Sequence, residues 1–384
     1  MVRWNIHKCL FLTCLLVQIH PGLRVAGHAE DTSTFFPIGI YGVRSAEDLE
    51  VVHQAGFNCV VGSSSTSFLD KAHTLGIRVI ASPGSAVRNS LNKKESSLQF
   101  KLADEHPAFL SWYLIDEPDL HRVPPWKVAM DQRLLKTLPA RSPVSVVLYN
   151  GSNTFDYGDI PDILMVDHYP VPWTPLSHFA ERMKNARHSL PKEKPAYAVI
   201  QAFDWEYFRE LLPNETEFRA PTLEELQCMT FMALAQGMDG IIYYTLRARD
   251  WYLPKHPDLW NGLQQVIDQV KENDFLLSAK RLWWLPKHQI TPYKLRNNAA
   301  LDRSISMTLF QDKNGIKHVL LINTTAHALD LKLRLPESEN RWSSVFQGDT
   351  PFGGFRSEVI YDIPFEPYQV RLLKGFETAS FVLP

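Results

Sequence analysis

The feature that most constrains this chain is a repeated alternation of short apolar runs with amphipathic segments between residues 35 and 246. The runs are rich in β-branched or aromatic residues and lie at 35–41, 57–62, 77–82, 109–115, 144–149, 162–169, 196–203 and 240–246. Such runs predict buried strands, and the segments between them predict helices. The alternation is typical of parallel sheets whose strands are joined by helical returns.

Helix boundary signals support this interpretation. Ser45 followed by Asp48 predicts a helix start, and Thr222 followed by Glu225 predicts a capping box. Gly56 and Gly237 stand where left-handed helix ends are expected. Only the link between the fifth and sixth runs is too short and too rich in glycine for a full helix.

Eight such units predict a closed (β/α)8 TIM barrel over residues 30–280, because about 250 residues is the usual length of that fold. An open doubly wound sheet is the alternative. It usually carries a G-x-G-x-x-G phosphate loop after its first strand, and "GIYGVRS" has none. After residue 280 the pattern changes to short alternating strands, which predict a C-terminal antiparallel β-sandwich over residues 281–384.

The first 29 residues predict a secretory signal peptide. Arg3 and Lys8 precede an apolar run over 9–19, and Gly27 and Ala29 have the spacing of a cleavage site. A membrane anchor is the alternative, but the run is shorter than the ~20 residues that a span requires. We therefore expect a secreted or otherwise extracytoplasmic protein with no membrane span after signal removal.

Two cysteines, Cys59 and Cys228, remain beyond the signal, both in apolar surroundings. We expect free core thiols, with a single disulfide as the alternative.

Charge and composition limit the kinds of ligand and the classes of enzyme that this sequence indicates. Forty basic residues against 42 acidic ones give a formal charge of −2, so no long-range field favours nucleic acid. No His-x-His stands on the first strand, and the chain has no C-x-x-C, H-E-x-x-H or G-x-S-x-G motif. The sequence therefore argues against a zinc enzyme and a serine esterase and implies no metal or cofactor.

Polar residues follow the later strands where each one ends. In TIM barrels the functional groups lie at the C-terminal ends of the strands, so we expect these side chains to converge. They include Asp116, Glu117, Asp167, His168, Tyr169, Gln201, Trp205 and Tyr244.

Hydrolysis of a glycosidic bond generally requires two carboxyl groups, one on each side of the bond. Glu117 is the best candidate for the general acid, because Trp112 and Tyr113 would raise its pKa by desolvation. The alternative is that Glu117 and Asp119 merely begin the next helix, with Pro118 in its first turn.

The segment "SWYLIDEPD" resembles the fourth-strand signature of the large clan of retaining glycoside hydrolases built on (β/α)8 barrels. "MVDHYPVP" and "AVIQAF" match related barrel sequences at strands six and seven. The resemblance implies that Glu117 is the acid/base. The clan's nucleophile is a strand-seven glutamate, and the corresponding residue here is Gln201, which cannot act as an ionised nucleophile. Asp116 replaces the asparagine that commonly binds the sugar 2-hydroxyl.

The second carboxylate therefore has to come from elsewhere. We favour Asp167, at a spacing suited to the ~6.5–9.5 Å of an inverting pair. Asp204 or Glu206 on the loop after strand seven, and Asp116 itself, are the alternatives.

Other rim residues are expected to bind the sugar. Tyr41, Trp112, Trp205 and Tyr244 offer aromatic faces for stacking, and His168, Tyr169 and Gln201 offer hydrogen bonds.

The sequence thus predicts a secreted glycoside hydrolase acting on an oligosaccharide, polysaccharide or glycoconjugate. Its catalytic residues would be Glu117, Asp167 and Asp116. The alternative is a non-catalytic carbohydrate-binding barrel that has lost the nucleophile.

Overall fold

The fold was analysed in a computed structural model that describes residues 35–83, 94–138, 140–282, 287–292, 304–334, 342–346 and 360–375. The predicted signal peptide, residues 1–29, lies outside the described residues. In the part of the chain that is described, no helix is long and apolar enough to cross a membrane.

Eight parallel strands close into a barrel in chain order, as predicted. They are β1 (Ile38–Tyr41), β2 (Cys59–Gly62), β3 (Arg78–Ala81), β4 (Phe109–Ile115), β5 (Val144–Leu148), β6 (Ile163–His168), β7 (Ala196–Gln201) and β8 (Gly240–Tyr244). The barrel closes where β1 pairs with β8, with Ile40 opposite Tyr243.

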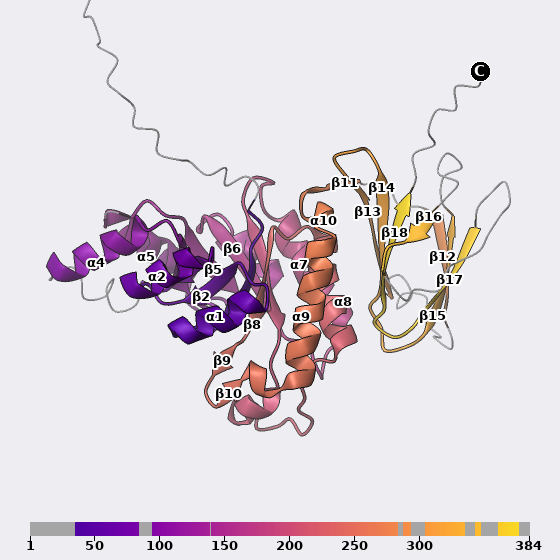
Figure 1. The fold of residues 1–384 in the computed structure, drawn as a ribbon, viewed down its shortest axis with the longest axis horizontal. Helices are drawn as coiled ribbons and strands as arrows, with labels where there is room; N and C mark the ends of the chain where they lie inside the picture. The colour runs from indigo at the N-terminus through magenta and orange to yellow at the C-terminus, as the bar shows by residue number, and fades with distance from the viewer. Residues whose placement is uncertain are drawn as a thin grey trace, which may run out of the picture. The chain divides into compact units, whose positions relative to one another are not determined.

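Helices connect the strands and lie outside them, as α1, α2 and α9 show in Figure 1. The helices are α1 (Ala46–Gln54), α2 (Thr66–Thr74), α4 (Lys94–Asp104), α5 (Pro125–Thr137), α6 (Thr154–Tyr157), α7 (Leu176–His188), α8 (Leu223–Gln236), α9 (Pro257–Glu272) and α10 (Phe275–Ser278). Short 3₁₀ turns are η3 (Gly151–Asn153), η4 (Trp205–Leu211) and η5 (Leu253–Lys255). The crossover between β5 and β6 is reduced to η3 and α6, as its short sequence predicted.

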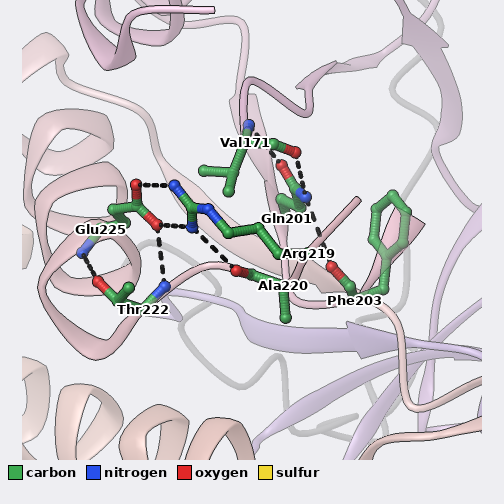
Figure 2. Close-up of polar contacts among 7 residues, drawn as sticks. All are labelled: Val171, Gln201, Phe203, Arg219, Ala220, Thr222 and Glu225. Carbon is green, nitrogen blue, oxygen red and sulfur yellow. Dashed lines mark hydrogen bonds and ion pairs between the residues drawn. The ribbon is translucent and has the colours of Figure 1, made fainter. Parts of the chain in front are cut away.

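The predicted helix caps are present. Ser45 accepts a hydrogen bond from the Asp48 backbone at 3.2 Å, and Thr222 and Glu225 form a reciprocal capping box at the start of α8. Arg219 donates to both carboxylate oxygens of Glu225, at 2.6 and 2.8 Å, which ties the loop after β7 to α8 (Figure 2). Gly237 ends α8 with φ 78°, a left-handed conformation that glycine adopts without steric cost.

The C-terminal region is antiparallel, as predicted, and contains two sheets with strand orders β11-β13-β14-β18-β16 and β12-β15-β17. Their strands are β11 (Lys280–Leu282), β12 (Lys287–Pro292), β13 (Ile305–Gln311), β14 (Lys317–Asn323), β15 (Leu329–Arg334), β16 (Trp342–Ser344), β17 (Ile360–Phe365) and β18 (Val370–Gly375). A two-stranded ribbon, β9 (Arg247–Ala248) with β10 (Trp251–Tyr252), follows β8.

One buried apolar cluster includes residues of both C-terminal sheets, among them Leu321 of β14 and Leu331 of β15. Cys59 and Cys228 are buried and free, which confirms the prediction of core thiols.

Candidate active site

The candidate site lies at the C-terminal ends of the barrel strands. In the sheet register, Ile200 of β7 pairs with His168 of β6 and with Tyr243 of β8. The next residue of β7, Gln201, pairs with Tyr244 of β8. Charges of Asp116, Glu117 and Asp167 act on one another and on the phenols around them. The predicted convergence of carboxyl groups at this end of the barrel is therefore found.

Glu117 is half-buried and follows β4 in a left-handed conformation, with φ 39°. That conformation costs a residue with a side chain about 1–2 kcal/mol, so the surrounding structure must hold it. Residues 118–122 form a turn, and the next helix, α5, begins only at Pro125. Glu117 is thus not the start of a helix.

The pKa of Glu117 is raised first by burial; its interaction with Asp167 acts to lower the pKa, and the negative charge of Asp116 raises it further. A raised pKa keeps a carboxyl group protonated closer to neutral pH, which a general acid requires.

Asp167 lies beside Glu117. The two carboxyl groups interact strongly enough that each shifts the pKa of the other, and Asp167 is only 3% exposed. Burial and the Glu117 charge raise the pKa of Asp167 well above its usual range. A pair in direct contact shares protons as a unit, because both groups cannot easily ionise together.

The interaction between the two groups favours a spacing shorter than the ~6.5–9.5 Å of an inverting pair, which was the spacing expected from the sequence.

Asp116 is exposed and accepts a hydrogen bond from the hydroxyl of Tyr113. Its charge raises the pKa of Glu117, Asp167 and Tyr244. Asp116 thus holds a tyrosine in place and adds negative charge at the barrel mouth.

Four tyrosines surround the carboxyl groups. The ring of Tyr41 lies 6.0 Å from that of Tyr113 and 5.5 Å from that of Tyr244, and Tyr244 lies 5.5 Å from Tyr169. Burial, followed by the nearby carboxylates, raises the pKa of Tyr244 to about 12. The tyrosines are therefore neutral hydrogen-bonding groups at physiological pH.

Trp205 extends this aromatic wall, with its ring 6.2 Å from Tyr169 and 5.3 Å from Trp173. The predicted placement of Tyr41, Tyr169, Trp205 and Tyr244 around one site agrees with these contacts.

The prediction that Trp112 stacks on a substrate is wrong. Its ring is stacked on Phe100 of α4 at 4.1 Å, and its Nε1 donates to Asp104 at 2.7 Å. Because side chains alternate along a strand, Tyr113 faces the opposite way and reaches the site that Trp112 was expected to line. The alternation was visible in the sequence, but the helix partners that decide between the two residues were not.

His168 is also placed differently from the prediction. It is 5% exposed, and its pKa is lowered to about 3, first by burial and then by the charges of Arg182 and His178 on α7. It therefore faces α7 while its neighbour Asp167 faces Glu117.

Gln201 is fully buried and bonded to the backbone, so it does not reach a substrate. Its Oε1 accepts from the Val171 N–H at 3.0 Å, and its Nε2 donates to the Val171 carbonyl at 2.9 Å and the Phe203 carbonyl at 3.4 Å (Figure 2). Two backbone carbonyl oxygens lie next to Nε2, so the side chain at position 201 must donate hydrogen bonds there. The amide is thus a structural link between β7 and the loop after β6.

The alternative second carboxylates are engaged elsewhere. Asp204 accepts from the Glu206 backbone at 2.8 Å at the start of η4, and Glu206 pairs with Arg209 at 2.7 Å. Asp119 accepts from the backbone N–H groups of Tyr149 and Asn150 at 3.0 and 2.9 Å. It joins the loops after β4 and β5, in agreement with a structural role.

Within the described segments, no group of three or more His, Cys, Asp and Glu side chains has the arrangement of a metal site.

Solved structures similar to this one include glycoside hydrolases. A glycoside hydrolase family 5 protein from Bacteroides vulgatus is 12% identical, with a TM-score of 0.57 and 91% of each chain covered. A GH42 β-galactosidase from G. stearothermophilus is 9% identical, with a TM-score of 0.58, covering 88% of this chain and 98% of the other. An α-amylase from Anoxybacillus is 9% identical, with a TM-score of 0.51, covering 88% of this chain and 90% of the other.

At these identities the similarity establishes the fold, a (β/α)8 barrel followed by an antiparallel region. No family model and no curated protein matches the sequence.

Proposed function

We propose that this protein is a glycoside hydrolase with Glu117 as its general acid. The observation that carries the proposal is a half-buried carboxyl group with a raised pKa, in contact with Asp167 and surrounded by tyrosines at the barrel mouth. A protonated carboxyl group can donate to the leaving oxygen of a glycosidic bond. Tyrosines present apolar faces and hydroxyl groups, a combination that suits a sugar ring. Glycoside hydrolases of similar fold support the same conclusion.

In this proposal Asp167 is the partner of Glu117, and Asp116 adjusts the charge at the mouth. The substrate is an oligosaccharide, polysaccharide or glycoconjugate that contacts Tyr41, Tyr113, Tyr169, Trp205 and Tyr244. We also propose that residues 1–29 direct secretion, that 30–280 form the catalytic domain and that 281–384 form a sandwich. Apolar residues shared by the two C-terminal sheets support the last point.

The test compares Glu117→Gln with Glu50→Gln on a panel of oligosaccharides and of 4-nitrophenyl glycosides. Glu50 is exposed on α1 and pairs with Lys71, so it serves as a matched control. On oligosaccharides we expect Glu117→Gln to lower kcat about 10²–10⁴-fold, the usual contribution of a general acid, and Glu50→Gln to leave it unchanged. The loss should be smaller on 4-nitrophenyl glycosides, because 4-nitrophenolate leaves without a proton. Equal turnover of oligosaccharides by parent and Glu117→Gln would remove Glu117 from the mechanism.

A carbohydrate-binding barrel without catalysis is the second candidate. It is favoured by the interaction between Glu117 and Asp167, because two adjacent carboxyl groups do not easily ionise together. Calorimetric binding of glycans with no product formed over days would favour this function over hydrolysis.

A further inference from the structure

Four residues near the barrel mouth have a buried polar atom with no hydrogen-bond partner among the described residues: Oδ1 of Asp167, the hydroxyl oxygen of Tyr41, Nε2 of His168 and Nε1 of Trp205. Buried polar atoms are nearly always hydrogen-bonded, so these need an explanation. Two of them, Oδ1 of Asp167 and the hydroxyl oxygen of Tyr41, belong to the group of carboxyl groups and tyrosines described above. A carboxylate oxygen accepts a hydrogen bond, and a phenol hydroxyl can donate one. The ring of Tyr41 lies 6.0 Å from that of Tyr113, whose hydroxyl donates to Asp116. Burial and then the charge of Asp116 raise the pKa of Tyr41, while its interaction with Tyr113 acts to lower it.

Within the described part of the chain, the candidates for a protein nucleophile have other partners. Gln201 is bonded to Val171, the nearby Asp204 and Glu206 have partners of their own, and Asp116 accepts a hydrogen bond from the Tyr113 hydroxyl. Asp167 lies beside the acid. A nucleophile that belongs to the substrate would meet the need of a retaining hydrolysis in this site.

Resting on the proposed hydrolase function, we propose that the substrate is a β-linked 2-acetamido-2-deoxyhexose whose amide group supplies the nucleophile. An amide has one N–H donor and one carbonyl acceptor, which match the two unpartnered atoms. Asp167 Oδ1 accepts from the amide N–H, and the Tyr41 hydroxyl donates to the amide carbonyl oxygen. These two contacts orient the carbonyl oxygen toward the anomeric carbon.

The reaction balances without another reactant. The amide oxygen bonds to C1 as the C1–O bond to the leaving group breaks, and Glu117 gives its proton to the leaving oxygen. Asp167 stabilises the positive charge that develops on the amide nitrogen. Water then adds to C1 and gives its proton to the Glu117 carboxylate, while the bond between C1 and the amide oxygen breaks and the 2-acetamido group re-forms. Two displacements at C1 retain the anomeric configuration.

The same chemistry determines the anomeric configuration of the glycosidic bond that can be cleaved. The amide on C2 reaches C1 only from the face opposite the leaving group. In the gluco and galacto series this requires a β-glycoside. The inference therefore excludes α-linked substrates and sugars with a 2-hydroxyl.

The first experiment compares 4-nitrophenyl β-glycosides of glucose and galactose with their 2-acetamido and 2-trifluoroacetamido analogues. We expect turnover only with the 2-amides, a β-configured first product by NMR, and a kcat at least ~10-fold lower for the trifluoroacetamide because its oxygen is a weaker nucleophile. Comparable kcat/KM for the 2-hydroxy sugars would overturn this inference and leave the hydrolase function standing. Absence of turnover of any glycoside would overturn both.

The second experiment measures binding of a thiazoline that mimics the bicyclic intermediate, by calorimetry on the full chain. Asp167→Asn should weaken binding ~10–100-fold, the range for a hydrogen bond to a charged group, and Tyr41→Phe about 5-fold. Glu50→Gln, at an exposed position of α1, is the control and should bind like the parent. Equal binding by all four proteins would overturn the assignment of Asp167 and Tyr41.

Discussion

Gln201→Glu places the expected clan nucleophile at the end of β7, and its effect follows from the contacts of the amide. An ionised glutamate can still accept the hydrogen bond from Val171 N–H. Its second oxygen, however, has no proton to donate to the two carbonyl oxygens that the amide now contacts, those of Val171 at 2.9 Å and Phe203 at 3.4 Å. A protonated glutamate can donate to the Val171 carbonyl. The variant therefore binds a proton more tightly when folded than when unfolded.

The direction of the pH effect follows from this difference. The folded pKa of the introduced carboxyl group is raised above the unfolded value of ~4.3, so the folded state holds more protons and stability falls as pH rises. The loss is ~1.4 kcal/mol per pH unit until the folded pKa is reached, or up to ~4 kcal/mol between pH 4 and pH 7. At pH 4 the variant should be within about 1 kcal/mol of the parent.

Urea unfolding of parent and variant at several pH values between 4 and 8 measures this difference. Gln265→Glu, at an exposed position of α9, is the matched control and should track the parent at every pH. A Gln201→Glu curve parallel to that of the control would refute the donor requirement at position 201. We also expect the variant to gain no glycosidase activity, since its carboxylate stays bonded to the loop.

Three further variants test other parts of the structure. Trp112→Phe should lower stability by about 1–3 kcal/mol in urea unfolding, because the buried Asp104 loses a donor, while KM stays unchanged. Thr222→Ala should cost about 1 kcal/mol by loss of the α8 cap, again seen by urea unfolding and with no change in kcat. Asp167→Asn should stabilise the protein progressively above pH 5, because the raised pKa of Asp167 makes the parent less stable as pH rises; a pH-independent difference would contradict this.

Strand positions were predictable because each apolar run is bounded by local signals. All eight predicted runs contain an observed strand, and Ser45 and Thr222 cap helices as expected. The runs are longer than the strands at several ends: the run 35–41 contains β1 at Ile38–Tyr41. Flanking apolar residues pack without joining the hydrogen-bond ladder, and sequence alone does not separate packing from pairing.

Which face a strand-end residue occupies was harder to predict. Trp112 and Tyr113 point to opposite faces, as do Asp167 and His168, and one member of each pair was misplaced. The side of the sheet to which a side chain points depends on the register with the neighbouring strands and on irregularities in strand pairing. The pairing of β4 with β5 shifts between Tyr113 and Ile115, a break that no local pattern in the sequence indicates.

The glutamine at the end of β7 and the carboxyl pair at the mouth are two parts of one arrangement. Gln201 bonds both backbone groups of Val171, and Val171 lies in the loop that follows Asp167 and His168 at the end of β6. An amide at position 201 thus fixes the loop that follows Asp167, whereas a glutamate there would repel it. In this barrel the β7 side chain positions the end of β6, and the carboxylate beside Glu117 comes from β6 itself. Because the two residues are connected through this loop, variants at 167 and 201 should show non-additive effects when combined.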